Sequence, residues 1–222
     1  MGISERKERE KEQRRQDIID AAERVFFSKG YENATMADIA RSAELSKGTL
    51  YLYFTNKNEL CMAITIRGLD IFHNQLSELK LENKSGIDKF YEIPQFYMRF
   101  SEEFSNYYQG LLNFRMHHQN CPVGGDYYQR CSLELKDINQ IIAEIIKSGI
   151  EDGTIRTDVE PVTLAHIIWG DQSGILPSYD SQAKDFTGAS HTPQSLLNYH
   201  FQLLGRGIEQ NRHPDESFTG NL

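Results

Sequence analysis

The sequence predicts an all-α protein, and three observations support that prediction. Apolar residues recur with the 3.6-residue period of a helix along most of the 222 residues. Side chains typical of helix N-caps stand three positions before an acidic residue, as in Thr35–Asp38 and Asn56–Glu59. The strict alternation of apolar and polar residues that marks half-buried strands is absent from the sequence.

The first expected helix follows a charged N-terminal arm, residues 1–13, in which acidic and basic side chains alternate. One interpretation of the arm is a solvated extension of the helix, or a frayed end. The alternative is an arm whose Arg14 and Arg15 approach phosphate groups. An apolar stripe then begins, and Lys29-Gly30 ends the helix; the stripe comprises Ile18, Ala22, Val25 and Phe26.

Two short helices joined by a tight turn are expected next. Thr35 caps the first helix, Glu44-Leu45 forms the turn, and Ser46 caps the second, which we expect to run from Lys47 to Tyr53. Packed against the helix before them, residues 35–54 form a helix-turn-helix.

The second short helix keeps one face free for a partner. Gly48 in its first turn permits close approach of another backbone, and Lys47 at the helix N-terminus suits a phosphate. Thr35 and Lys57 also stand at helix starts, where they suit flanking phosphates. The partner that this pattern predicts is double-stranded DNA.

The rest of the chain has the pattern of further helices. We expect a long helix over 57–80, two aromatic-rich helices within 87–118, and helices over 127–150, 158–176 and 192–208. Pro94 lies near the start of the first aromatic-rich helix or kinks it. The last two helices have broad apolar faces, which favour a homodimer formed through an intersubunit four-helix bundle over a monomer core.

The formal charge of −8 argues at first against nucleic acid as a partner. The charge is uneven, however. Residues 1–60 hold 11 Lys and Arg against 11 Asp and Glu, so the whole acidic excess lies in the remainder of the chain. This asymmetry predicts two parts with different partners.

Several other classes of protein are disfavoured. Apolar runs fall far short of the ~18 residues that span a membrane, and the charged start has no apolar segment, so we expect a cytoplasmic protein without membrane contact or a secretory signal. Cys61, Cys121 and Cys131 are irregularly spaced and fit a reducing compartment. Nucleophile–base, zinc and phosphate-loop motifs are absent, so we expect neither enzyme activity nor a cofactor.

Residues 14–68 resemble the TetR family of bacterial transcription regulators. The resemblance rests on a dense set of residues: Gly30-Tyr31, Thr35, Ile39-Ala40, Ser46-Lys-Gly-Thr-Leu-Tyr-Leu-Tyr-Phe54 and Lys57-Asn-Glu-Leu60. Beyond this stretch only the helical layout is similar. A helical protein-interaction module with a vestigial helix-turn-helix stays open as an alternative.

The resemblance implies a DNA-binding domain at 14–74, an effector-binding and dimerisation domain at 75–212, and a polar tail at 213–222. It implies a homodimeric repressor that a small apolar or aromatic effector releases from a palindromic operator, with activation as the alternative. In such a regulator Thr35, Thr49, Tyr53 and Lys57 contact phosphates. The residues at the major groove are Lys47, Gly48, Thr49, Tyr51 and Leu52.

Two positions depart from the family pattern. Glu44 stands where glycine is usual, which predicts a non-glycine residue with positive φ. Leu52 replaces the frequent His or Tyr, and an apolar side chain there can touch a thymine methyl but cannot donate a hydrogen bond. Packing beneath the third helix is the alternative role for Tyr51 and Tyr53, and the favoured one for Phe54.

The expected effector site is much less defined by the sequence. Eleven aromatic residues lie between Phe90 and Tyr128. They either pack in a helical core or line a pocket for an effector. Our candidates for a lipophilic effector are Phe100, Phe104, Phe114, Tyr128 and Trp169, with Glu103 as a carboxylate that would select a cation. His117, His118, Cys121 and Cys131 have metal-ligand or redox side chains, but their spacing matches no zinc site, so we expect no metal.

Overall fold

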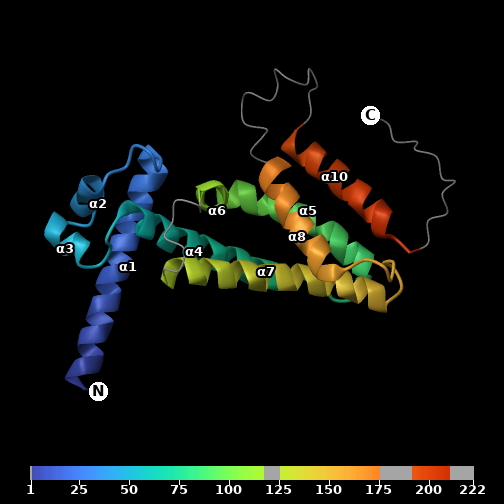
Figure 1. Ribbon diagram of the computed structural model, residues 1–222, viewed down its shortest axis with the longest axis horizontal. Helices are drawn as coiled ribbons and strands as arrows, with labels where there is room; N and C mark the ends of the chain where they lie inside the picture. Colours follow the sequence, from blue (N-terminus) through green and yellow to red (C-terminus); the bar gives the residue numbers. More distant parts are fainter. Residues whose placement is uncertain (1, 118–125, 176–191, 211–222) are drawn as a thin grey trace. The chain divides into compact units, whose positions relative to one another are not determined.

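The computed structural model describes residues 2–117, 126–175 and 192–210, and helices make up most of this part of the chain (Figure 1). Outside the helices, these residues form a single isolated β-bridge, between Ile155 and Glu209. The all-α prediction is therefore confirmed. The helices are α1 (Ile3–Lys29), α2 (Met36–Ser42), α3 (Lys47–Tyr51), α4 (Lys57–Ser77), α5 (Gly86–Glu103), α6 (Ser105–His117), α7 (Asp126–Glu151), α8 (Pro161–Ile175) and α10 (Pro193–Ile208).

The helix bounds differ from the predicted ones by a few residues at several ends. α1 begins at Ile3, so the charged arm is an exposed extension of the first helix. α3 ends at Tyr51 because the amides of Leu52 and Tyr53 bond to carbonyls three residues back, at 3.2 and 3.0 Å, which tightens the last turn. Pro94 lies inside α5 and not near its start.

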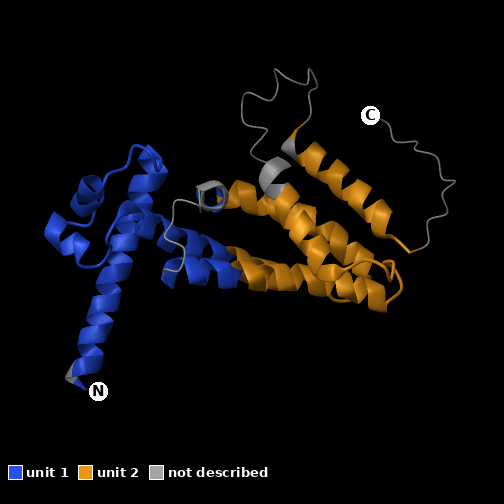
Figure 2. Cartoon of the chain, viewed as in Figure 1, with its two compact units in different colours: residues 1–71, 105–134 blue, residues 72–104, 135–222 orange. Residues whose placement is uncertain are grey.

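The chain divides into two compact units (Figure 2). Unit 1 comprises residues 1–71 and 105–134, and unit 2 comprises residues 72–104 and 135–222. This division does not follow the expected domains, because α6 and the start of α7 belong with the N-terminal helices. The domain boundaries at residues 13, 74 and 212 remain predictions.

Unit 1 has one apolar core beneath its first four helices. Each of α1, α2, α3 and α4 contributes buried residues to it, and the largest include Ile18, Phe26, Ile39, Leu50, Phe54 and Leu60. Leu50 and Phe54 are fully buried, so the packing role that the sequence favoured for Phe54 is confirmed. This core fixes the position of α3 in unit 1.

Unit 2 has an aromatic core. The ring of Phe72 meets those of Phe96, Tyr97 and Phe100 edge-on, with centroids 4.8, 5.3 and 4.8 Å apart. Such edge-to-face pairs add about 0.5–1.5 kcal/mol each beyond the burial of their area. Phe90 of α5 packs against Phe201 of α10 at 5.3 Å, which joins these two helices.

A glycine pair lets α5 and α7 approach closely within unit 2. A Cβ built on Gly86 would lie 2.0 Å from Cα of Gly149, which leaves no room for a side chain. The same approach lets the carboxylate of Asp152 accept a hydrogen bond from the Gly86 amide at 2.6 Å. The first turn of α5 is thereby held against the end of α7.

We expect Gly86→Ala to destabilise the protein by roughly 2 kcal/mol or more, because the two backbones must separate to admit a methyl group. Gly110→Ala is the matched control: it also lies in a helix, but a Cβ there meets nothing within 4 Å. That substitution should be neutral or stabilising by up to about 1 kcal/mol, since alanine favours helices over glycine. Equal effects of the two substitutions in denaturant unfolding would contradict this account of the glycine pair.

Candidate nucleic-acid interface

Helix α2 begins with a reciprocal pair of hydrogen bonds. The Thr35 hydroxyl oxygen accepts from the Asp38 amide at 3.1 Å, and the Asp38 carboxylate accepts from the Thr35 amide at 3.2 Å. Ser46 caps α3 in a similar way, because its Oγ accepts from the Thr49 amide at 3.0 Å. The N-caps that the sequence predicted for these two helices are therefore confirmed.

The turn between α2 and α3 has the backbone conformation that the sequence predicted. Glu44 has a φ of 56°, in the left-handed region that glycine adopts more readily. The chain then reverses, and the Leu45 amide donates to the carbonyl of Ala40 at 2.9 Å. The turn closes onto α2, which sets the start of α3.

An apolar residue, Leu52, caps the C-terminus of α3 and is exposed. Leu52 is 82% exposed and Tyr51 is 50% exposed, and both rank among the most exposed large apolar side chains of the described residues. Lys47 and Gly48 are also exposed, while Thr49 and Tyr53 are half-buried. A Cβ on Gly48 would meet only Ser46 Oγ, at 3.8 Å, so the first turn of α3 is open to a partner. The predicted reading residues therefore lie on one short segment with solvent around it.

Lys57 has a role in the fold that the sequence did not predict. Its ammonium group donates to the carbonyls of Tyr31, Glu32 and Ala34, at 2.8, 3.4 and 3.2 Å. The same group lies 4.2 Å from the centroid of the Tyr31 ring. Lys57 thus fixes the connection that leads into Thr35, and contact between Lys57 and a phosphate remains a prediction.

Asp38 is the centre of a small charged cluster beside the start of α2. Its carboxylate lies 2.9 Å from the ammonium of Lys29 and 3.5 Å from the guanidinium of Arg41. Hydrogen bonds from Lys29 and then Thr35 lower the pKa of Asp38 from 3.8 to about 2. The carboxylate therefore stays ionised at acidic pH values below its usual range, where it can still accept from the Thr35 amide.

Two tyrosines from α6 and α7 contact α1 and the core beneath the helix-turn-helix. Tyr107 donates to Glu23 of α1 and packs edge-on against Phe27, with ring centroids 5.3 Å apart. Burial, and then the neighbouring Glu23, raises the pKa of Tyr107 to about 12. Tyr127 stacks on Phe54 with centroids 6.3 Å apart and accepts a hydrogen bond from Arg15.

The sequence placed neither tyrosine at this position, because both belong to a run of aromatic residues that gives no long-range partner. Arg15 points to Tyr127 and Phe54, with its guanidinium carbon 5.1 and 5.2 Å from their ring centroids. These contacts tie α6 and the start of α7 to α1 and the helix-turn-helix within unit 1.

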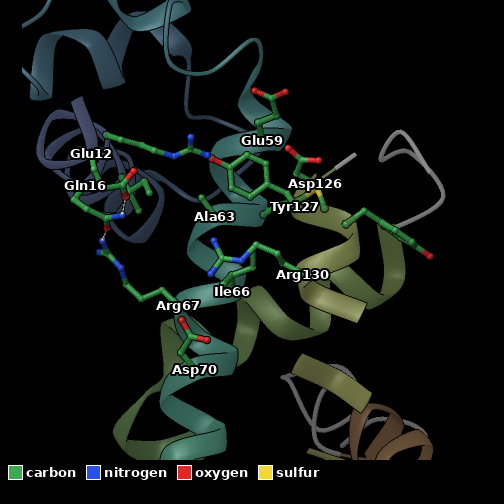
Figure 3. A pocket seen from close by; sticks show the side chains of 14 residues that line it. Glu12, Gln16, Glu59, Ala63, Ile66, Arg67, Asp70, Asp126, Tyr127 and Arg130 are labelled. Carbon is green, nitrogen blue, oxygen red and sulfur yellow. Dashed lines mark hydrogen bonds between the residues drawn. The ribbon is translucent and has the colours of Figure 1, made fainter. Parts of the chain in front are cut away.

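The candidate effector residues do not gather around one described cavity. Phe100 and Phe104 stack in unit 2, and Trp169 lies edge-on to Phe72 there, whereas Glu103 is exposed. Tyr128 lines a cavity of about 480 Å³ in unit 1 instead (Figure 3). Phe114 belongs to α6, but its side chain lies outside the described part.

The candidate metal and redox residues are placed only in part. Cys131 is fully buried, which leaves its thiol out of contact with solvent. His118 and Cys121 lie outside the described residues, as does the side chain of His117. Hypotheses about these groups therefore stay untested.

Comparisons with known proteins agree with the helix-turn-helix geometry. Residues 18–64 match the family model described as bacterial regulatory proteins, tetR family. The HTH-type transcriptional regulator SAR2658 of Staphylococcus aureus is 33% identical over 98 residues, which span 44% of this chain and 51% of that protein. The probable HTH-type transcriptional regulator ArpR of Pseudomonas putida is 29% identical over 174 residues, 75% of this chain and 80% of ArpR.

Solved structures share the fold over most of the chain. AibR, crystallised with isovaleryl coenzyme A and operator DNA, has a TM-score of 0.63 at 19% identity, covering 86% of this chain and 97% of that one. The transcriptional regulator FadR of Bacillus subtilis, crystallised with stearoyl-CoA, has a TM-score of 0.61 at 22% identity, covering 87% and 98%. At these identities the likeness extends to the fold alone.

The lowered pKa of Asp38 gives a pH dependence to the stability of this interface. Because the carboxyl is more acidic in the folded protein, its contribution is complete above its ordinary pKa of 3.8 and is lost as the pH falls towards 2. We expect Asp38→Asn to lower the melting temperature at pH 5 and to have a shrinking effect between pH 4 and pH 2. A difference between the two proteins that does not change with pH would show that this carboxylate does not stabilise the folded state through its charge.

Proposed function

The chain belongs to the TetR family of bacterial transcription regulators, and on that premise we propose that it is a homodimeric repressor. In this proposal a small apolar or aromatic effector releases the dimer from a palindromic operator. The observation that most supports this proposal is that Tyr51 and Leu52 are exposed at the end of α3 while Leu50 of the same helix is buried in the core. An exposed apolar tip on a rigid short helix suits a groove that presents thymine methyl groups.

Each proposed DNA contact follows from the position of its side chain. Lys47, Gly48, Thr49, Tyr51 and Leu52 would lie in the major groove, with Gly48 allowing the backbone to approach closely. Thr35 and Lys57, at the starts of α2 and α4, would hold phosphates on either side, as would Thr49 of α3 and Tyr53 just after it.

Exposed apolar residues on the last two helices support the proposed homodimer. Val162 and Ile167 of α8 are 50% and 46% exposed, and Tyr199 and Leu203 of α10 are 47% and 44% exposed. A second copy of the chain would cover these side chains through a self-complementary interface. Two α3 helices in such a dimer would read half-sites about 34–36 Å apart, or a multiple of that distance.

Effector control would act through differential binding to two dimer geometries. A ligand that binds better to the geometry in which the two α3 helices do not match the operator spacing lowers the affinity for DNA. A coupling free energy of roughly 1–3 kcal/mol between effector and DNA binding is usual. AibR and FadR each bind a coenzyme A thioester with an apolar acyl chain, which supports an apolar effector here. α4 contributes to both units and would transmit the change.

The proposed site of action is the cytoplasm, where a bacterial regulator meets its operator. Among the described residues, none of the helices is both long enough and apolar enough to cross a membrane.

Substituting Lys57→Ala should weaken binding to all DNA sequences alike and reduce the slope of log affinity against log salt by about 1 for each chain bound. The matched control is Lys84→Ala, which removes the same charge from a lysine of unit 2 that pairs with Glu92. Lower affinity with an unchanged slope in fluorescence anisotropy titrations would exclude phosphate contact. Lys57 would then act only through the carbonyls of residues 31–34.

Substituting Leu52→Ala should relax base preference at one position of each half-site, because the methyl contact with thymine would be lost. The expected loss is roughly 1 kcal/mol for the preferred base and little for the others. Leu133→Ala is the control, since Leu133 of α7 is also an exposed leucine, at 58%. A uniform loss across operator variants in competition binding would make Leu52 a packing residue.

A further inference from the structure

The N-terminal extension of α1, residues 3–17, sorts its charged side chains onto two sides of the helix. The signs alternate along the sequence, and residues 4–14 are all exposed. With 3.6 residues per turn, however, the charges form a basic stripe and an acidic stripe whose centres lie about 120° apart around the helix axis. The basic stripe comprises Lys7, Lys11 and Arg14, and the acidic stripe comprises Glu5, Glu8 and Glu12.

Ion pairs within the helix do not account for this sorting. In the part of the chain that the structure describes, neither Lys7 nor Lys11 has an ion pair. The two lysines stand four positions apart, where like charges repel each other on a helix. Glu10 borders the basic stripe, but it pairs with Arg6 instead, at 2.8 Å. The chain therefore leaves the positive charge of both lysines without a partner.

The two arginines that follow the lysines differ in how firmly the chain holds them. Arg14 lies 3.9 Å from Asp17, but both side chains are exposed, and exposed pairs of this kind contribute little. Arg15 donates to the hydroxyl of Tyr127 and packs over its ring. Arg14 is therefore available to an anionic partner together with the lysines, whereas Arg15 is not part of the stripe.

The basic stripe lies on the side of α1 that packs against the helix-turn-helix. At the same spacing along the helix it leads to Ile18, Ala21 and Val25, which are buried. Ile18 and Val25 belong to the core shared with α2 and α3, and the Ser42 hydroxyl at the end of α2 donates to the Ala21 carbonyl at 3.5 Å. Figure 1 shows the N-terminal half of α1 continuing past α2 and α3.

The acidic stripe lies on the side of α1 that packs against α4. At the same spacing it leads to Gln16 and Glu23, and Arg67 of α4 bonds to both of these side chains, to Gln16 at 3.0 Å. Beyond its first residue, Lys57, α4 carries no proposed DNA contact. A duplex that receives α3 would therefore meet the basic stripe of the extension and not the acidic one.

We propose that the N-terminal extension of α1 is a second DNA-binding element, whose basic stripe contacts phosphates beyond the bases that α3 would read. The inference rests on the proposed function, because the duplex is the one that α3 enters. The stripe from Lys7 to Arg14 extends roughly 10 Å along the helix axis, which is longer than the spacing of phosphates along one strand. Phosphate contacts carry no sequence information, so the extension would add affinity and leave base preference unchanged.

A duplex selected from a random pool by the unaltered full chain, with extra base pairs on both flanks, is the probe. Lys7→Gln combined with Lys11→Gln should weaken binding roughly tenfold and lower the slope of log affinity against log salt by about 2 for each chain bound. Fluorescence anisotropy titrations measure both quantities. On a duplex trimmed to the selected bases, the variant and the unaltered chain should bind alike. Unchanged affinity and slope on the long duplex, or an equal loss on the trimmed one, would overturn the inference.

A rearranged extension tests the position of the charge rather than its amount. Four substitutions exchange neighbouring residues: Lys7→Glu, Glu8→Lys, Lys11→Glu and Glu12→Lys. Composition and net charge stay the same, but the two lysines move about 100° around the helix, towards the side of α4. Affinity for the long duplex should fall at least as far as in the double variant. Binding as tight as that of the unaltered chain would overturn the inference.

Lys136→Gln combined with Lys147→Gln is the matched control. It removes the same charge from two exposed lysines in the part of α7 that belongs to unit 2. Affinity and salt slope should stay as in the unaltered chain, and a loss as large as that of the first double variant would overturn the inference. Thermal unfolding checks that every variant is folded, as expected for substitutions of exposed side chains.

The two proposals fail in different ways. If the unaltered chain selects no duplex, the proposed repressor is contradicted, and the inference that rests on it falls as well. If the chain selects a duplex and the variants of the extension bind it as tightly as the unaltered chain does, only the inference about the extension is contradicted.

Discussion

The apolar core shared by α1, α2, α3 and α4 is the constraint on which the rest of unit 1 depends. α3 has five residues, too few to form a stable helix in water by itself. Leu50 and Phe54 hold it because both are fully buried among the neighbouring helices. The side chains of Tyr51 and Leu52 are exposed on a fixed backbone for this reason, which is what a reading surface requires.

The same core explains why unit 1 includes residues from α6 and α7. Tyr107 and Tyr127 both pack against it, and polar contacts to Glu23 and Arg15 fix their orientation. Helix α6 and the start of α7 are therefore part of the structure that positions the helix-turn-helix. Any ligand that shifts these residues would act on the proposed DNA-binding surface without crossing a long chain of intermediates.

The sequence predicted the helix-turn-helix well because the interactions that define it join residues close together in the chain. Thr35, Glu44 and Ser46 each act through neighbours a few residues away, and Phe54 acts through its burial in the core. The carbonyl contacts of Lys57 and the tyrosine contacts of α6 and α7 join residues 23 to 112 positions apart, for which periodicity gives no partner. The candidate effector residues were the least predictable, because an aromatic run has the same spacing in a core as in a pocket.

The two units differ in net charge. Residues 1–71 and 105–134 hold equal numbers of acidic and basic side chains, so the whole formal charge of −8 belongs to unit 2. A neutral module attracts phosphate only weakly at long range, so direct contacts with DNA must supply its affinity.

Hydroxyl-radical footprinting of the full chain on the DNA upstream of its own gene tests this account most directly. The account predicts two protected half-sites on one face of the duplex, with centres one helical turn or a multiple apart. A single protected half-site, or protection that does not depend on sequence, would contradict it.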